Sequence, residues 1–356
     1  MLCCVMRVFH LQGAVLDGGT MSQQTFRFSD SFAMFVKPPV RSLIHHLPGP
    51  FQTAISIIRE YRSVLGYYPH ILFPRTFNEK IQVRKLFDRR RQLTEWADKY
   101  LVRDYVRRTL GPDVLPTLYH VTADPSDIPF DLLPKQYVIK ATHGSGWTYI
   151  VRDGAAVNRQ EIIDRCKTWL STSYYALKKE WPYKNIIPRI LIEEFLDNGT
   201  GTTPNDYKFF VFAGKVKFIQ VDTNRYTDHR RDLYDTGWNR MECRYKYEHC
   251  AGKLARPENL GTMIDYAQRL AGDIDFVRVD LYGIQGKIYF GELTNTPSNG
   301  FGRFRPISWD KTFGKFWKMR ILSDACRSWW VSRGSYGQVR RPVAGAGFTE
   351  QARRFQ

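Results

Sequence analysis

Cysteine is scarce in this chain of 356 residues, and its spacing fits none of the usual cysteine-based sites. No Cys-x-x-Cys pair occurs, which argues against a structural zinc site, and the number is too small for a disulfide framework in so long a chain. We therefore expect reduced thiols, as in a cytosolic protein. The six cysteines are Cys3, Cys4, Cys166, Cys243, Cys250 and Cys326.

Long hydrophobic runs are also absent. No apolar stretch approaches the roughly 18–20 residues that would span a bilayer, so we expect no membrane span and a cytoplasmic location. The opening MLCCVMRVFHLQGAV is mildly apolar, but it lacks a basic n-region and a small-residue cleavage site, which argues against a signal peptide. A second methionine, Met21, precedes a more regular sequence, so residues 1–30 are expected to be disordered or to contain a mis-assigned start at Met1.

Acidic residues are outnumbered. Asp and Glu total 35 against 53 Lys and Arg, which gives a net charge of +18 and a pI near 9.6. This excess predicts an anionic partner, which the charge leaves open among nucleotide, acidic polymer, nucleic acid and membrane surface. Basic pairs such as Arg107–Arg108 are typical of a solvated helix face. The apolar content of 43% excludes collagen-like and largely disordered classes.

Helical patterns dominate the first third of the chain. Apolar residues recur at helical spacing from 42 to 65, with breaks at Pro48 and Pro50. Residues 77–91 form an amphipathic pattern with Asn78 as its candidate cap. Residues 93–111 predict a second helix that ends at a glycine.

Beyond Leu115 the pattern changes to short β-like runs, with helices expected at 159–169, continuing toward 175, and at 263–270. The last two strands form a predicted hairpin with a short turn at Gly283–Gly286. The predicted strands are 137–142, 147–153, 189–196, 207–214, 215–223, 276–283 and 287–294.

The segment YVIKATHGSGWTYIVRD is the first candidate for a binding site. A strand carries Lys140 into a small-residue loop, His143–Gly146, and a second strand follows. Glycines let backbone N–H groups approach an anion, and the lysine can reach its phosphate oxygens. The segment is not a P-loop, because the lysine precedes the glycines and no helix follows. Two glycines in a hairpin are usually only a turn, and this segment by itself favours a plain hairpin over a phosphate site.

The segment FVRVDLYGIQGKIYFGELTNTP is the second. Arg278 and Asp280 share a strand face, and hairpin register can set Glu292 beside Asp280. Two carboxylates with oxygen donors at Thr294 and Asn295 suit Mg²⁺ held together with phosphates, and the arginine suits phosphate charge. Solvated acids on an outer face, or a glycosidase-type carboxylate pair, are the alternatives.

Two further segments are less informative alone. In LIEEFLDN an apolar strand runs into Glu193 and Glu194, a common surface arrangement. In DYKFFVFAGKVKFIQ, Lys208 shares a strand face with Phe210 and Phe212. A lysine there needs an anion or a route to water along its own stem, and this segment by itself favours the route to water.

The order of these segments is more informative than any one of them. A lysine–glycine loop, an acid-tipped strand, an acid–lysine strand and then Arg-x-Asp and Glu-x-x-x-x-Pro resembles the ATP-grasp ligases. The chain is similar in particular to the TupA-like ATP-grasp family, of the teichuronopeptide-synthesis type, over about Phe77–Phe304. The phrases that carry the resemblance are FNEKIQVRKLFDRR, ADKYLVRDYV, YVIKATHGSG, EWPYKNIIPRILIEEF, DYKFFVFAGKVKFIQ, FVRVDLY and GKIYFGELTNTPSNGFGRF.

The resemblance implies an α+β ATP-grasp fold, in which two α+β subdomains enclose ATP after a mostly helical N-terminal region. The implied divisions are a helical region at 31–92, the ATP-grasp domain at 93–310 with subdomains of about 93–195 and 196–310, a C-terminal helix at 311–335 and a disordered basic tail at 336–356.

The resemblance also implies roles for single residues. Arg103 and Lys140 match cations on the nucleotide phosphates, Arg278 matches the arginine that stabilises the transferred phosphoryl group, and Asp280 and Glu292 match the magnesium carboxylates. The other implied ATP contacts are His143, Gly144, Ser145 and Gly146 in a flap, Glu193, Glu194, Phe195 and Leu196 beside adenine, Asp206 at the ribose, and Lys208. The superfamily usually has Asn two residues after the glutamate. Here Thr294 stands there, so Thr294 or the next residue, Asn295, is the third metal ligand.

The implied activity is ATP- and Mg²⁺-dependent ligation of a carboxylate to an amine through an acyl phosphate. The family name implies an amino acid or amine joined to an acidic saccharide, such as a uronic acid, in cell-surface or capsular polysaccharide synthesis. Nucleic acid is not an expected partner. The alternatives are a kinase-like or glycosyl-modifying enzyme with the same nucleotide grip, a catalytically weak homologue, and a basic module that binds acidic polymer.

Overall fold

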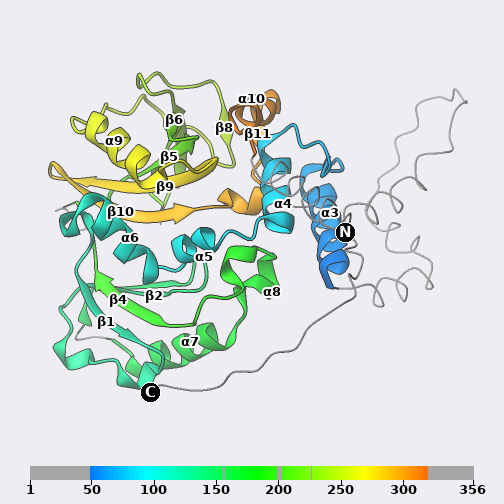
Figure 1. Ribbon diagram of the computed structural model, residues 1–356. Helices are drawn as coiled ribbons and strands as arrows, with labels where there is room; N and C mark the ends of the chain where they lie inside the picture. The colour runs from blue at the N-terminus through cyan, green and yellow to red at the C-terminus, as the bar shows by residue number, and fades with distance from the viewer. Residues whose placement is uncertain (1–48, 155–156, 199–202, 226, 320–356) are drawn as a thin grey trace, which may run out of the picture. The chain divides into compact units, whose positions relative to one another are not determined.

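The computed structural model describes residues 49–154, 157–198, 203–225 and 227–319, which are coloured in Figure 1. By its internal contacts the chain divides into two units, Met1–Gln52 and Thr53–Gln356. All described residues except 49–52 belong to the second unit. The expectations for residues 1–30, for 320–335 of the C-terminal helix and for the tail at 336–356 lie outside the described residues.

Helices open the described chain, as predicted, but their limits differ. They are α3 (Gly49–Leu65), α4 (Phe77–Phe87), α5 (Arg91–Ala97) and α6 (Leu101–Leu110). The predicted helix at 77–91 ends at Phe87, and the predicted helix at 93–111 is broken into α5 and α6. The break lies at Asp98, whose Oδ1 accepts hydrogen bonds from the backbone N–H groups of Tyr100 and Leu101 at 2.8 and 3.3 Å. This carboxylate satisfies N–H groups at the start of a new helix.

The cap of α4 is Thr76, so the prediction of Asn78 is wrong. The Oγ1 atom of Thr76 accepts from the Glu79 N–H at 3.1 Å, and the Glu79 carboxylate accepts from the Thr76 N–H at 2.9 Å, which completes a capping box. Asn78 lies inside the helix, and its Nδ2 donates to the carbonyl of Gly302 and to Asp310. Both residue types are good caps, and only the backbone path before the helix distinguishes them.

The first sheet is antiparallel, with the strand order β1–β4–β2–β3. Helix α7 (Arg159–Ser171) covers one face, where Ile162 and Cys166 pack with Ile139 and Ile192. Alternate residues of β2 and β4 therefore point to the opposite face. The strands are β1 (Leu118–Thr122), β2 (Tyr137–Ala141), β3 (Thr148–Val151) and β4 (Ile190–Glu194), and α8 (Tyr174–Lys178) and the 3₁₀ turn η6 (Trp181–Tyr183) precede β4.

The second sheet has the strand order β10–β9–β5–β6–β7, and all its neighbouring strands are antiparallel. On one face Val277, Val279 and Leu281 of β9 pack with residues of α9 (Leu260–Ala271) and α6. On the other face Phe276 contacts Phe77 of α4, and the polar residues of β9 follow. The strands are β5 (Asp206–Phe212), β6 (Lys215–Thr223), β7 (Arg230–Tyr234), β9 (Phe276–Ile284) and β10 (Lys287–Thr294).

The seven predicted strands are confirmed as β2, β3, β4, β5, β6, β9 and β10, with ends within two residues of the prediction. Strands β1, β7, β8 (Arg244–Tyr245) and β11 (Phe304–Arg305) were not predicted, because they are short or, like RRDLY in β7, lack a clean apolar alternation. Helix α10 (Ser308–Phe316) starts before the predicted residue 311 and ends well before 335. The remaining turns are η2 (Pro112–Val114), η3 (Pro125–Asp127), η4 (Phe130–Leu132) and η7 (Pro297–Gly300).

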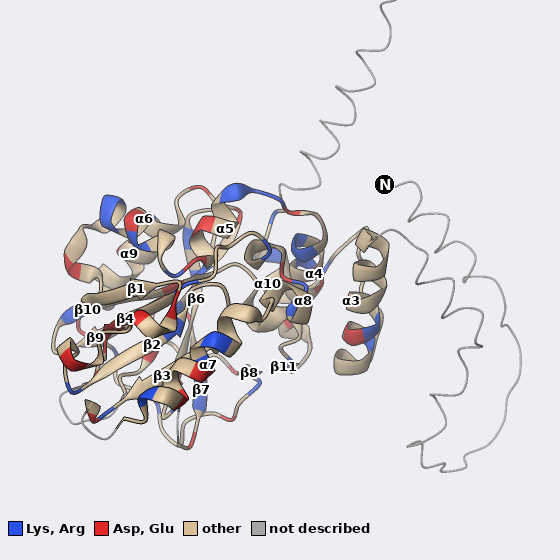
Figure 2. Cartoon of the chain, turned by 90° about the horizontal axis from the view of Figure 1, so that it is seen from below, with Lys and Arg blue, Asp and Glu red and all other residues tan. Residues whose placement is uncertain are grey.

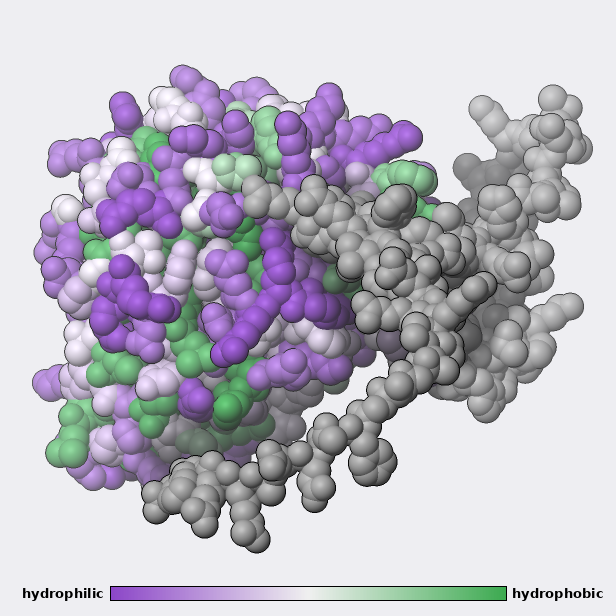
Figure 3. Space-filling model, in the orientation of Figure 1, coloured by the Kyte–Doolittle hydropathy of each residue, from purple (hydrophilic) through white to green (hydrophobic). Residues whose placement is uncertain are grey.

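Charges of both signs are mixed on the outer helices, as the blue and red segments of α6 and α7 show in Figure 2. Arg107 pairs with Asp104, and Arg165 pairs with Glu161, all at exposed positions. Hydrophilic side chains cover much of the face in Figure 3, and hydrophobic ones form separate small patches. None of the described helices has the length and apolar character of a transmembrane segment.

Candidate nucleotide and metal site

A cavity of about 430 Å³ lies between the two sheets. Strands β2 and β4 line one side, strands β5, β6, β9 and β10 line the other, and α5, α6 and several loops complete the wall. The predicted site residues that line it are Arg103, Lys140, Ser145, Gly146, Glu193, Glu194, Phe195, Leu196, Asp206, Lys208, Arg278, Asp280 and Glu292.

On the first sheet, Lys140 and Arg103 share one carboxylate. Nζ of Lys140 on β2 donates to Oε1 of Glu193 on β4, and Nη1 of Arg103 on α6 donates to Oε2 at 3.0 Å. The Glu193 side chain is only 9% exposed, so the three groups are held firmly at the cavity wall. Two cations against one anion leave an excess of positive charge for a ligand.

The glycine loop is only partly in the cavity. Ser145 and Gly146 line it, and Gly146 has a φ of +80° that favours glycine. His143 is buried with Nε2 3.0 Å from the Trp169 carbonyl oxygen, and neither it nor Gly144 is a lining residue.

Lys99 lines the cavity too, and the sequence analysis missed it. Its Nζ donates to the carbonyl oxygen of Gly144, which ties the glycine loop to the segment before α6. Burial lowers the pKa of Lys99 to about 8, although Glu292 acts in the opposite direction. In the helix predicted at 93–111, Lys99 stands four residues before Arg103, a spacing that puts two side chains on one face. The structure instead places Lys99 just before the start of α6.

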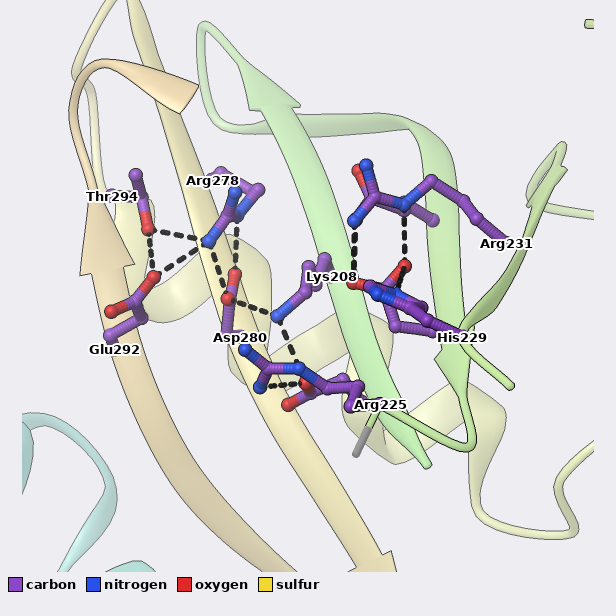
Figure 4. Close-up of polar contacts among 11 residues, drawn as sticks. Lys208, Arg225, His229, Arg231, Arg278, Asp280, Glu292 and Thr294 are labelled. Carbon is purple, nitrogen blue, oxygen red and sulfur yellow. Dashed lines mark hydrogen bonds and ion pairs between the residues drawn. The ribbon is translucent and has the colours of Figure 1, made fainter. Parts of the chain in front are cut away.

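The second sheet presents a lysine between two buried carboxylates. Lys208 is the register partner of Asp280, and its Nζ donates to Oδ2 of Asp280 at 2.7 Å. The same Nζ lies 3.3 Å from Oδ2 of Asp206, the first residue of β5. Figure 4 shows the Lys208 side chain pointing toward Asp280. The Lys208 side chain is only 7% exposed, so its ammonium group does not extend into bulk water. The expectation that this lysine has a route to water along its stem is wrong.

One arginine bridges the two acids proposed for magnesium. Nε and Nη2 of Arg278 donate to Oδ1 and Oδ2 of Asp280 at 2.7 and 2.6 Å, and Nη2 also donates to Oε1 of Glu292 at 2.7 Å (Figure 4). Burial alone would lower the pKa of Arg278, but the two carboxylates raise it above its ordinary value. Burial likewise opposes ionisation of Glu292, yet Arg278 and Lys208 hold its pKa at about 2. Glu292 is therefore ionised at neutral pH.

A β-bulge sets the position of Glu292. From Lys287 to Phe290, β10 pairs with β9 in one register, which then shifts so that Glu292 faces Asp280. The extra residue is Gly291, whose Cβ position lies 3.0 Å from the Asp280 carbonyl oxygen. The predicted pairing of Glu292 with Asp280 is confirmed.

Thr294, the last residue of β10, and Asn295, which follows it, contact different groups. Thr294 Oγ1 donates to Oε1 of Glu292 at 2.6 Å and accepts from Nη2 of Arg278 at 2.8 Å. Asn295 is buried, and its Nδ2 donates to the Leu93 carbonyl oxygen at 2.8 Å. The structure thus brings Thr294, and not Asn295, to the carboxylate pair.

The remaining predicted residues form the segment at the end of β4. Oε2 of Glu194 accepts from the N–H and the hydroxyl of Thr117, each at 2.9 Å. The Phe195 ring lies under the Arg152 guanidinium, 5.0 Å from it. Phe195 and Leu196 line the cavity where the chain passes from the first sheet toward the second.

Among the other lining residues that carry no sequence prediction are His229, Arg231, Lys246 and Tyr247. They belong to β7 and to the segments around β7 and β8, strands that the sequence pattern did not reveal. In the described part of the chain, no group of three or more His, Cys, Asp or Glu side chains is arranged to hold a metal.

The structure has two α+β halves. Their sheets present lysines, an arginine and a carboxylate pair to one cavity, an arrangement typical of the ATP-grasp class. Residues 79–318 match the TupA-like ATPgrasp family, and the chain belongs to this family. The resemblance of the sequence phrases to that family is thereby confirmed.

Several solved ligases are similar to this chain. D-alanine–D-alanine ligase from Bacillus anthracis in complex with ATP matches at 16% identity and a TM-score of 0.33, over 57% of this chain and 55% of that one. A second structure of this ligase matches at 17% and 0.37, over 69% and 71%. Phosphoribosylamine–glycine ligase from Thermotoga maritima matches at 13% and 0.36, over 59% and 51%. The chain thus spans little more than half the length of the first and the third. Among curated proteins no sequence match is found.

Proposed function

We propose that this protein is an ATP-dependent carboxylate–amine ligase that works through an acyl phosphate. The observation that carries the proposal is a single cavity with Lys140 on one wall and Lys208, Arg278, Asp280 and Glu292 on the other. Phosphoryl transfer needs positioning and charge neutralisation more than covalent help from the protein. This set of charges supplies both.

The first sheet and the glycine loop would hold the nucleotide. Lys140 and Arg103 share Glu193 and so keep positive charge available for phosphate oxygens. Lys99 adds a third cation beside the loop. Following the family pattern, Glu193–Leu196 would contact adenine and Asp206 the ribose.

The carboxylate pair fits Mg²⁺. In nucleotide enzymes Mg²⁺ is held by one or two carboxylates together with phosphate oxygens. Asp280 and Glu292 already accept from one cationic nitrogen of Arg278, so both point to a common cation position. Mg²⁺ bound by these two residues, with the Thr294 hydroxyl beside them, would neutralise triphosphate charge.

The proposed reaction has two steps, which residues of the chain would assist. A substrate carboxylate oxygen bonds to the γ-phosphorus and ADP leaves, and an amine then attacks the acyl carbon, releasing phosphate and a proton. Arg278 and Lys208 offset the negative charge that opposes approach of a carboxylate to ATP. No described residue needs to act as a dedicated base.

The proposed substrates are an acidic saccharide, such as a uronic acid, and an amino acid or amine, joined in cell-surface or capsular polysaccharide synthesis. The family's teichuronopeptide name and the net charge of +18 support this class. The use of ATP favours a cytoplasmic location.

Calorimetry with a non-hydrolysable ATP analogue and Mg²⁺ tests the proposal. Lys140→Ala and Asp280→Ala should each weaken Mg²⁺-dependent binding at least tenfold, about 1.4 kcal/mol. The matched controls Lys253→Ala and Asp265→Ala, both outside the cavity, should not. Absence of binding by folded wild-type protein would contradict the proposal.

Hydroxylamine separates the ligase from a kinase-like enzyme with the same nucleotide site. A ligase supplied with ATP and its acid substrate forms an acyl phosphate, which hydroxylamine converts to a hydroxamate. A kinase that phosphorylates a hydroxyl forms none. Uronic acids are the first acids to supply.

The second candidate is a basic module that binds acidic polymer without catalysis. The net charge of +18 and the threonine in place of the usual asparagine ligand favour it. Its affinity for a polyanion should fall steeply with added salt and should be unchanged by Asp280→Ala.

A further inference from the structure

Four residues at one part of the cavity have no role in the proposed nucleotide site. They are His229, Arg231, Lys246 and Tyr247. Figure 4 shows the His229–Arg231 group and the Arg278–Glu292 group on opposite sides of Lys208. The cavity therefore continues past the carboxylate pair to a second group of charges.

Arg231 is fixed in place. Its Nε and Nη2 donate to the two carboxylate oxygens of Asp222, the second at 2.9 Å, and Nη1 donates to the Tyr245 carbonyl oxygen at 3.4 Å. Gln220 donates to Asp222 as well, at 3.0 Å. Because Asp222 is already engaged by these groups, it has little capacity to neutralise another cation.

An aromatic pair closes this part of the cavity. The His229 imidazole stacks on the Tyr247 ring with centroids 3.8 Å apart, and the Arg231 guanidinium lies 4.7 Å from the same ring. Burial lowers the pKa of His229, although Asp222 acts in the opposite direction. His229 therefore contributes an aromatic ring to the cavity wall and no positive charge at neutral pH.

Lys246 supplies the unbalanced charge. Its backbone has a φ of +65°, a conformation rare for a side-chain-bearing residue and often found at binding sites. Within the described ranges its ammonium group makes no ion pair or hydrogen bond, and it lies 5.8 Å from the centre of the Tyr247 ring. Among the described residues, the Asp222 carboxylate acts on both Lys246 and Arg231, so one negative charge faces two positive charges.

This pair is offset from the reacting centre across the sheet. Strand β7, with Arg231, is separated from β9, with Asp280, by β5 and β6, and three strand spacings amount to about 14 Å between main chains. A substrate that contacts both the Arg278 group and this pair needs two separate anionic groups, and an acidic saccharide can carry them.

We propose that Arg231 and Lys246 bind a second anionic group, carboxylate or phosphate, on the acid substrate. The substrate is then a saccharide acid with at least two anionic groups, one activated near Arg278 and the other held at Lys246. This inference rests on the proposed ligase function and gives it a substrate class and an acceptor position.

The test is calorimetry on the full chain with the ATP analogue and Mg²⁺ already bound. The probes are galacturonic acid, digalacturonic acid and galacturonic acid 1-phosphate. At least one dianionic probe should bind tenfold or more tightly than the monoacid, and the probe that does so identifies the second group as carboxylate or phosphate. Lys246→Gln should reduce this advantage to less than threefold, and Arg231→Lys should reduce it as well. Lys253→Gln, a lysine outside the cavity, should keep it.

Three results with the saccharide probes would overturn the inference. They are equal affinity for the monoacid and both dianions, an advantage that survives Lys246→Gln, and an equal loss in Lys253→Gln. If Lys246→Gln weakens the ATP analogue alone by as much as the dianion, the pair serves nucleotide phosphate and the inference fails while the ligase stands. If wild-type protein fails to bind the analogue, the proposed function itself has failed. Retained analogue binding by Lys246→Gln shows that this variant is folded.

Discussion

Glu292 lies opposite Asp280 only because a bulge at Gly291 moves the β9–β10 pairing by one residue. Continued in the register of Phe290 and Leu281, Glu292 would pair with Val279 and point into the apolar core that Val279 joins. The bulge turns it to the face of Arg278. One inserted residue thus decides whether this hairpin carries a carboxylate pair.

Gly291→Val tests the bulge. The new Cβ would lie 3.0 Å from the Asp280 carbonyl oxygen and 3.1 Å from the Tyr282 ring, so the strand must shift. We expect at least tenfold weaker Mg²⁺-dependent binding of the ATP analogue in calorimetry and about 1–3 kcal/mol lower unfolding free energy in urea. Gly252→Ala is the control, since no atom lies within 4 Å of its Cβ position. Unchanged affinity in Gly291→Val would show that the bulge does not matter to the site.

Thr294 and Asn295 should separate metal binding from stability. Thr294→Val removes the hydroxyl that contacts Glu292 and Arg278. We therefore expect the gain in ATP-analogue affinity that Mg²⁺ produces to be about threefold to tenfold smaller than in the wild type. Asn295→Ala loses the hydrogen bond to Leu93 and should lower the unfolding free energy by about 1–3 kcal/mol with the Mg²⁺ effect intact. Magnesium titrations and urea unfolding of both variants provide the comparison, and the reverse pattern would assign the metal ligand to Asn295.

Lys99 should make nucleotide affinity depend on pH. With a pKa of about 8 it is protonated at neutral pH and loses its charge as the pH rises through that value. Only the protonated amine attracts phosphate, so affinity for the ATP analogue should fall above about pH 8. Lys99→Arg keeps its charge across this range, and Lys99→Met never carries it. Dissociation constants measured from about pH 6.5 to pH 9.5 should therefore rise with pH in the wild type alone, and an identical rise in Lys99→Arg would assign the titration to another group.

Asn78 should matter more to stability than the cap residue Thr76. Asn78→Ala loses two buried hydrogen bonds, to Gly302 at 2.8 Å and to Asp310 at 2.9 Å, at an expected cost of about 2–4 kcal/mol. Thr76→Ala loses a helix cap and should cost about 0.5–2 kcal/mol. Urea unfolding of the two variants measures the difference. A smaller cost for Asn78→Ala than for Thr76→Ala would contradict the positions described here.

The sequence by itself determined the elements and the residue types that carry the chemistry. Alternating apolar residues predicted seven strands because a pleated strand buries every second side chain. The spacing of Arg278 and Asp280 put both on one face, and a short turn joined their strand to that of Glu292. These are local relationships, which the chain's own geometry dictates.

The tertiary structure alone decided which of these residues meet. The sharing of Glu193 by Lys140 and Arg103 and the burial of Lys208 beside Asp280 join strands and helices far apart in the sequence. The bulge at Gly291 lies within one hairpin, but no sequence pattern predicted the register that it sets. The group around Lys246 depends on β7 and β8, two strands that no local sequence pattern predicted. Register and burial are decided by packing in the folded chain, and these contacts place the charges around one cavity.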